Sequence, residues 1–260
     1  MKFTLLAGHF LTFAAASAVP ILEGNLATRE LQPGEIILIN GNKTDVVTEV
    51  ALHEFYKAEG ILLEKPAIDE EWLNFVPELV NETSAELSAR QIRCSPTTSL
   101  VVDRQERFVD WDVQMSPVVL GAGAGITVRV ESGWTVSNAV SVSAGVDGTW
   151  VKDRLSTTFG VSYTRTWTST TSQSYQVPIP AGQRGVFVTQ PWTNRKYGRT
   201  FRGCPGSMVQ TGTFMADSHE EGSYENSRWV SGQITACIKR YGPKQVGTRM
   251  TRCNGQGEFR

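Results

Sequence analysis

The chain has 260 residues, of which 40% are hydrophobic and 20% charged, and its net charge at neutral pH is −1. After residue 18 no apolar run is long enough to span a bilayer as a helix, which excludes a helical membrane protein. The near-neutral total conceals two halves, because residues 19–93 carry a net charge of −8 and residues 94–260 a net charge of +6.

The N-terminus has the pattern of a secretory signal. Lys2 precedes the apolar run Phe3–Ala16, and Ala16-Ser17-Ala18 has the small-x-small arrangement of a signal-peptidase site. This pattern predicts a signal peptide over residues 1–18 and a secreted, extracellular protein.

The acidic segment, residues 19–93, is expected to be small and of mixed α/β structure. Ile36–Ile39 reads as a short strand closed by the turn Asn40-Gly41. Apolar residues then recur at helical spacing from Val46 to Tyr56, after Thr44-Asp45 as a cap, and the helix is expected to stop near Gly60.

The end of the acidic segment looks like a processing site. Arg90 and Arg93 have the R-x-x-R spacing of sites cut by convertases of the kexin or furin type. Both glycosylation sequons, at Asn42 and Asn81, come before this point, and every cysteine comes at or after Cys94. We expect residues 19–93 to be a pro-segment that is removed, with an acidic solvated tail as the alternative.

The four cysteines predict two disulfides in an exported chain. Without a Cys-x-x-Cys pair, their spacing is not that of a zinc site. Of the three pairings that four cysteines allow, we expect Cys94 with Cys253 and Cys204 with Cys237, since the first would tie the loose C-terminal end to the start of the domain.

Residues 126–179 form the most regular stretch of the chain. Apolar residues alternate with polar and small residues in two long runs, and in the second run these are almost all serine and threonine. Asp147-Gly148 lies in the link between the runs. Period two is typical of half-buried strands, so the stretch predicts one long amphipathic β-hairpin. The residues expected on its apolar face are Val128, Val140, Val142, Val146, Leu155, Phe159, Val161 and Tyr163.

The hairpin has two interpretations. As a structural element its apolar face packs on a core and its hydroxyl face meets water. As a functional element it is a pore-forming stem, in which copies from several protomers close a barrel through a membrane, with homo-oligomerisation as the corollary. Arg165, Ser132 and Asn138 interrupt the apolar faces and weigh against insertion.

A basic and aromatic stretch follows the hairpin, and it is the candidate for surface binding. Arginines pair with anionic groups, and aromatic faces stack on sugars or bases. For an exported protein we expect a lipid, glycan or protein of a target cell and no nucleic acid, with an ordinary edge strand as the alternative. The candidate residues are Trp192, Arg195, Lys196, Tyr197, Arg199 and Arg202.

Catalytic patterns are weak. His219 is the one histidine after Cys94 and lies in a polar stretch typical of a solvated loop. Asp110 and Asp112 flank Trp111 as a glycosidase pair would, but charge on an exposed strand edge explains them as well. Gly121–Gly125 precedes a strand and lacks the dinucleotide spacing. We therefore expect no cofactor, no metal and no enzymatic activity.

Three short stretches carry a resemblance to known proteins: Ser141–Val146, Ser156–Thr164 and Val177–Gln183. They resemble small secreted fungal proteins described as effector-like. They are also similar to the stem of aerolysin-type β-pore-forming proteins, in which strands rich in serine and threonine precede a Pro-x-Pro-x-Gly turn. The similarity covers about residues 125–188, and no recognisable receptor-binding lobe accompanies it.

Together these features predict a mainly-β protein, an elongated antiparallel sheet or sandwich with no helix after Cys94. The expected function is that of a secreted, disulfide-stapled, glycosylated effector or virulence protein that binds a target-cell surface or a host component. A β-pore-forming protein is the first alternative and a secreted hydrolase the weaker one.

Overall fold

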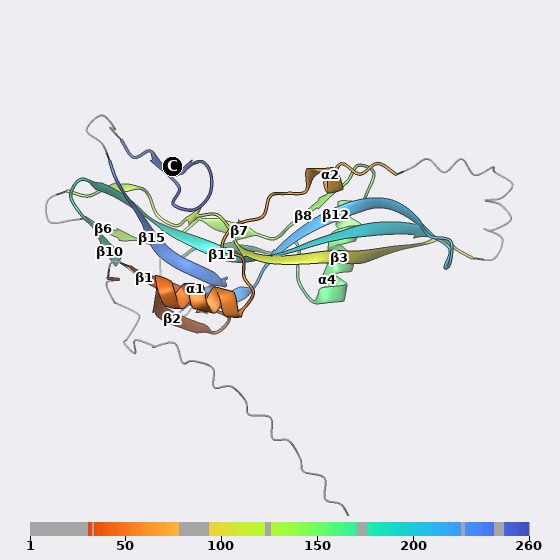
Figure 1. Cartoon of the computed structure of the whole chain (residues 1–260), viewed down its shortest axis with the longest axis horizontal. Coiled ribbons are helices and arrows are strands. Elements are labelled where there is room, and N and C mark those ends of the chain that lie inside the picture. Colours follow the sequence, from red (N-terminus) through yellow and green to blue (C-terminus); the bar gives the residue numbers. More distant parts are fainter. Residues whose placement is uncertain are drawn as a thin grey trace, which may run out of the picture.

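The computed structural model describes residues 31–32, 34–77, 94–122, 126–170, 176–224, 227–241 and 247–259. Within these residues the chain is mainly β and is built on an elongated antiparallel sheet of nine strands (Figure 1). The predicted fold class is confirmed. No helix of the described part is long and apolar enough to cross a membrane.

The sheet is organised around one long strand, β11 (Gln183–Gly203), which has 21 residues. The first half of β11 pairs with β15 (Gly232–Arg240), and the second half lies between β3 (Thr97–Val109) and β12 (Val209–His219). A single strand therefore runs through both ends of the molecule (Figure 1).

Two β-strands of the acidic segment extend this sheet. β1 (Glu35–Asn40) pairs with β2 (Lys43–Thr48) through the predicted turn, in which Gly41 has a φ of 57°. On its other side β1 pairs with β15, so that Ile37 lies opposite Ile234. The predicted strand Ile36–Ile39 is confirmed, and it is an integral part of the main sheet.

The first helix begins later than the sequence pattern indicated. α1 is Glu49–Ala58, and Thr48 caps it by accepting a hydrogen bond from the backbone N–H of Ala51 at 3.4 Å. The prediction of a helix from Val46 was wrong, because Val46 and Val47 are β-branched and pair with β1 as part of β2. The helix ends at Ala58, two residues before Gly60, as expected.

The described part of the acidic segment contributes to the core. Ile37 and Ile39 are fully buried in one cluster with Phe187 and Ile234. Burial of this kind is a non-covalent contact that holds the segment against the rest of the chain. Removal of residues 19–93 stays a prediction, because Arg90 and Arg93 lie outside the described residues. The predicted signal peptide (1–18) and Asn81 also lie outside them, whereas Asn42 is exposed at the β1–β2 turn.

Residues 61–77, here called the strap, cross one face of the sheet. Leu62 forms a parallel bridge with Phe108 of β3, with backbone hydrogen bonds to Arg107 (2.9 Å) and Val109 (2.8 Å). The strap includes the single helical turn α2 (Glu70–Leu73), which is capped by Asp69.

The opposite face of the sheet is covered by the helix α4 (Gly148–Phe159), which follows β8 (Ala139–Val142), a neighbour of β12. Val151 and Leu155 of the helix are fully buried against Phe214. Because successive strand residues point to opposite faces, β12 meets the strap through Thr213 and α4 through Phe214.

The two ends of the stretch 126–179 pair with each other, as predicted for a hairpin. β6 (Ile126–Arg129) pairs with β10 (Gln176–Ile179), which places Ile126 opposite Ile179. Further in, β7 (Thr135–Ser137) pairs with β9 (Thr166–Thr168). The antiparallel course of the two arms is confirmed over these short strands.

The middle of the predicted hairpin is wrong, because α4 replaces both the expected link after Asp147 and the expected start of the second strand at Leu155. Asp147 accepts hydrogen bonds from Thr149 and Trp150, which is helix N-capping, and Gly160 closes the helix with a φ of 68°. Val151 and Leu155 are four residues apart, so the apolar period here is that of a helix. The expectation of no helix after Cys94 is corrected by the same finding.

The residues assigned to the apolar hairpin face mostly lie in the core. Val128, Leu155 and Tyr163 are buried, and Val140, Val142, Val146 and Val161 are partly buried against the α4 cluster. Phe159 is the exception, since 39% of it is exposed. It lies at the end of α4, with the Lys196 ammonium 5.0 Å from its ring centroid.

The disulfide pairing differs from the expectation. Cys94 is bonded to Cys204 and Cys237 to Cys253, with Cα–Cα distances of 6.0 and 5.7 Å. The register of β3 against β11 explains the first bond, because Thr97 lies opposite Gly203. Two disulfides are compatible with an extracellular protein.

The remaining strands are short. β4 and β5 pair with β11, β13 pairs with β14, and β16 pairs with β17 near the C-terminus. Their bounds are Val113–Gln114 for β4, Val119–Leu120 for β5, Glu221–Tyr224 for β13, Ser227–Val230 for β14, Met250–Thr251 for β16 and Glu258–Phe259 for β17.

Candidate functional site: an aromatic groove beside a buried polar row

The basic and aromatic stretch is not an exposed surface. Trp192, Arg195 and Tyr197 are at most 1% exposed, because β11 is a central strand covered on both faces. This corrects the prediction of a surface binding site at these three residues. Of the other three candidates, Lys196 is partly buried beside Phe159, Arg199 is paired with Asp103 at 2.6 Å, and Arg202 is exposed.

Arg195 forms the centre of a polar row under the strap. Its guanidinium donates two hydrogen bonds to Asp217, at 2.8 and 2.7 Å, and a third to the backbone carbonyl of Pro66 at 3.3 Å. Burial alone would lower the pKa of Arg195, but the bonds to Asp217 outweigh it and the pKa is raised. The pair therefore stays charged while it is buried.

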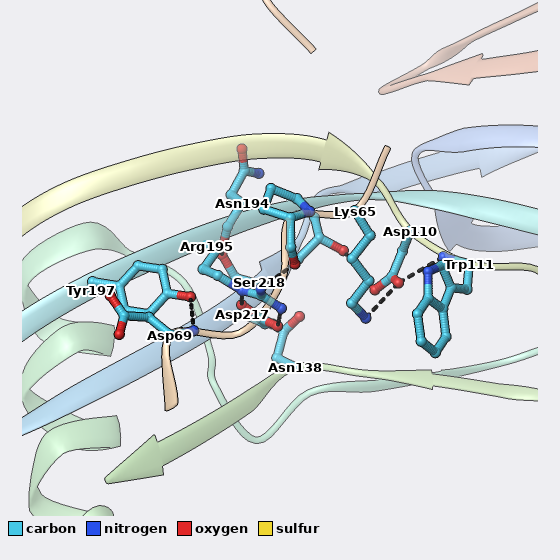
Figure 2. Close-up of polar contacts among 12 residues, drawn as sticks. Lys65, Asp69, Asp110, Trp111, Asn138, Asn194, Arg195, Tyr197, Asp217 and Ser218 are labelled. Carbon is cyan, nitrogen blue, oxygen red and sulfur yellow. Dashed lines mark hydrogen bonds and ion pairs between the residues drawn. The ribbon is translucent and has the colours of Figure 1, made fainter. Parts of the chain in front are cut away.

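Towards one end, the row ties the strap to β3. Asp69 pairs with Arg104 at 2.8 Å, and the Arg104 guanidinium lies 3.9 Å from the ring centroid of Tyr197. The backbone N–H of Trp72 and the Arg104 side chain both lower the pKa of Asp69. Figure 2 shows the row running from Tyr197 and Asp69 through Arg195 and Asp217 to Lys65 and Asp110.

Towards the other end, the row includes His219, which was interpreted as a solvated loop residue. It is instead the last residue of β12, and 9% of it is exposed. Its Nδ1 lies 3.1 Å from Asn138 Oδ1 and its Nε2 lies 3.2 Å from Thr193 Oγ1. Burial lowers the pKa of His219, so the ring is neutral at pH 7.

Asn138 fixes the proton position on this ring. Its Nδ2 donates to the Ser162 carbonyl at 2.8 Å and its Oδ1 accepts the backbone N–H of His219 at 2.7 Å, so Oδ1 faces the ring as an acceptor. Nδ1 must then carry the proton, while Nε2 lies beside the Thr193 hydroxyl, whose one proton is donated to Asp110. Both ring nitrogens of His219 therefore lie beside polar groups of the fold.

The two carboxylates around Trp111 are also engaged in the fold. Asp110 pairs with Lys65 at 2.7 Å and accepts a hydrogen bond from Thr193 at 3.1 Å. Asp112 is 1% exposed and accepts the side-chain N–H of Gln190 at 2.5 Å and the backbone N–H groups of Cys253 and Asn254 at 2.7 and 2.8 Å. Asp112 therefore anchors the C-terminal loop.

Asp112, Cys237 and Cys253 bring their ligand atoms within 4.8 Å of one another. A metal would need thiolates, but the two sulfurs are bonded to each other. These residues do not fit a metal ion.

A groove of about 450 Å³ opens beside the polar row. Two partly exposed tryptophans, Trp111 and Trp134, lie on its walls with groups of both charges. Its volume falls within the range of small-molecule sites in proteins. The lining residues are Lys65, Asp110, Trp111, Asp112, Val113, Gln114, Trp134, Arg252 and Glu258.

Sequence reasoning missed this groove. Asp110, Trp111 and Asp112 were noted as a pair of carboxylates around an aromatic residue, but Trp134 was assigned to the hairpin. Arg252 and Glu258 come from the C-terminal loop, and the one local signal for their position is the neighbouring Cys253.

Comparison with known proteins identifies no relative. No protein-family model, no curated protein and no solved structure matches the chain.

Proposed function

We propose that this chain is a secreted, non-enzymatic protein that binds a component of a target cell's surface in the Trp111–Trp134 groove. The observation that carries the proposal is the groove itself, in which two partly exposed indoles stand beside polar groups. Aromatic residues of this kind supply contact area with little loss of side-chain entropy. Secretion rests on the N-terminal signal pattern, and the effector-like label rests on the resemblance to secreted fungal proteins.

The non-enzymatic part of the proposal is supported by the state of the candidate catalytic groups. His219 is buried between Asn138 and Thr193, and Asp112 accepts three hydrogen bonds. Asp110, which faces the groove, is paired with Lys65. A general acid or base needs reach to a substrate proton, and these groups already have partners in the fold.

The experiment is a cell-binding assay with fluorescently labelled protein. Trp134→Ala and Trp111→Ala should each lower binding at least about tenfold, the loss typical of an aromatic anchor. Trp150→Ala is the matched control, because Trp150 is a partly exposed tryptophan of α4 away from this groove. Equal binding by the wild type and both groove variants, with all three folded by circular dichroism, would sink the proposal.

Membrane insertion by residues 126–179 is a second candidate, favoured by the pairing of the two ends of the stretch. Because Ile126 lies opposite Ile179, the two ends of the stretch lie side by side, as the base of a hairpin would. The paired strands β7 and β9 have exposed hydroxyl side chains, namely those of Thr135, Ser137, Thr166 and Thr168. Insertion would require α4 to unfold and β8 to leave β12.

A covalent staple tests this second candidate. Ser141 of β8 lies opposite Met215 of β12, so Ser141→Cys with Met215→Cys should hold the two strands together. If residues 126–179 insert, dye release from liposomes should be blocked in the oxidised variant and restored by mild reductant, with the wild type under the same reductant as control. Dye release by the stapled protein would contradict insertion.

A further inference from the structure

The groove has a polar group whose partner is missing among the described residues. The Arg252 side chain lines the groove, and its Nε is a buried atom without a hydrogen bond to another described residue. A buried donor without a partner is unfavourable, and native structures rarely leave one without a ligand or an ordered water. This donor has no acceptor among the described residues.

The walls of the groove are preorganised. The C-terminal loop that carries Arg252 is held by the Cys237–Cys253 disulfide and by the two backbone N–H groups donated to Asp112. Gly255, with a φ of 101°, packs so closely on Trp111 that a Cβ there would lie 2.4 Å from its Cγ. Such a site loses little entropy on binding.

The charges of the groove limit the ligand class. Lys65 is neutralised by Asp110, and Asp112 is buried under three hydrogen bonds. The other two charged groups of the lining, Arg252 and Glu258, are of opposite sign, and Glu258 also pairs with Arg249 at 3.9 Å. A phosphate or another anion therefore finds no excess of positive charge, whereas a neutral ligand with many hydroxyls finds both donors and acceptors.

The tryptophans favour the same ligand class. The C–H bonds on one face of a pyranose ring carry partial positive charge, and the face of an indole is negative. Trp134 makes no side-chain hydrogen bond to another described residue. Trp111 lines the same groove, and the Lys65 ammonium lies 5.1 Å from its ring centroid. A protein partner would need a contact area larger than this groove.

We infer that the groove binds an uncharged oligosaccharide of about two or three pyranose rings, a size set by its volume. Trp134 stacks on a ring, Trp111 forms the second wall, and Arg252 and Glu258 hydrogen-bond to hydroxyls. This assignment rests on the proposed function and names the ligand class of that same groove.

The test is isothermal titration of the folded full-length protein with four trisaccharides: those of N-acetylglucosamine, β-1,3-linked glucose, β-1,4-linked glucose and galacturonate. At least one of the three neutral probes should bind with a Kd of about 1 mM or tighter. Trp134→Ala and Arg252→Met should each weaken that binding at least about tenfold, and Trp150→Ala should leave it unchanged.

Three outcomes would overturn the assignment. They are no binding of any neutral probe, tighter binding of the galacturonate probe than of all neutral ones, or binding that the groove variants retain. If Trp134→Ala still lowers cell binding while no saccharide binds, the ligand class is wrong and the proposed function stands. If the groove variants bind cells like the wild type, the proposed function fails as well.

Discussion

Asn138 and His219 are joined by two hydrogen bonds to one oxygen, because Asn138 Oδ1 accepts both the backbone N–H and the ring Nδ1–H of His219, at 2.7 and 3.1 Å. Asn138 belongs to the stretch 126–179 and His219 ends β12. A side chain of this stretch is thus tied to the main sheet by buried polar contacts, so their loss should affect the stability of the whole fold.

Replacing Asn138 by alanine should lower the free energy of unfolding by about 1–3 kcal/mol, because the N–H and Nδ1 groups of His219 would lose their acceptor in a buried site. Chemical denaturation measures the loss. Ser137→Ala is the control, since the Ser137 hydroxyl is exposed and bonds to the exposed Thr166 hydroxyl. It should change stability by less than about 0.5 kcal/mol. Equal effects of the two variants would contradict the role of Asn138.

The protein should become less stable in mild acid, because protonation of His219 is easier in the unfolded state than in the folded one. Burial lowers the pKa of His219 in the folded state, and of the charged groups that face it, Asp110 and Asp217 oppose the shift while Lys65 adds to it. The unfolded value is about 6.5. The contribution is therefore complete above about pH 6.5 and is lost as the pH falls towards the lower folded pKa, where the unfolded state binds the extra proton.

Thermal melts between about pH 7.5 and pH 5 measure this dependence. His219→Asn keeps an N–H donor near Asn138 but does not titrate, so its Tm should vary less with pH than that of the wild type. Parallel profiles for the two proteins would assign the acid sensitivity to other groups.

Breaking the buried pair Arg195–Asp217 should lower the free energy of unfolding far more than breaking the exposed pair Arg199–Asp103. Asp217→Ala leaves a guanidinium that is 1% exposed without its partner, and we expect a loss of about 3–5 kcal/mol. Asp103→Ala should lose at most about 1 kcal/mol. The double variant Arg195→Met with Asp217→Leu should recover much of the loss, and urea denaturation compares all three.

The disulfide pairing can be checked by peptide mapping of the oxidised protein, which should find Cys94 with Cys204 and Cys237 with Cys253. Removing the second pair with alanines should reduce stability by about 3 kcal/mol, as expected for a sequence separation of 16 residues. It should also increase hydrogen exchange in residues 250–259. A peptide joining Cys94 to Cys253 would refute the pairing.

The features that could be predicted from the sequence are those that depend on how apolar residues repeat along a short segment. Strict alternation indicated β structure, and the pairing of Ile126 with Ile179 follows from two arms of similar length. The helix α4 was missed because its flanks alternate and because serine and threonine dominate its last turn. Val151 and Leu155, four residues apart, were the available signal.

The site was harder to predict. An alternating strand between two covered faces has the same pattern as one with an exposed face, so Arg195 and Tyr197 looked like surface residues. Their burial depends on the strap, which comes from a distant part of the chain. The groove unites residues as far apart as Lys65 and Glu258, and no local period relates them.

Because Ile37 pairs with Ile234, the outcome of a cut near Arg93 depends on whether the β1–β2 hairpin has already docked on β15. The β1–β2 hairpin emerges early but cannot dock until nearly the whole chain has left the ribosome, because its partner strand is close to the C-terminus. A cut near Arg93 made after docking would leave two pieces held by the ladder between them. The same cut made earlier would turn an intramolecular step into a collision between fragments, whose rate depends on concentration.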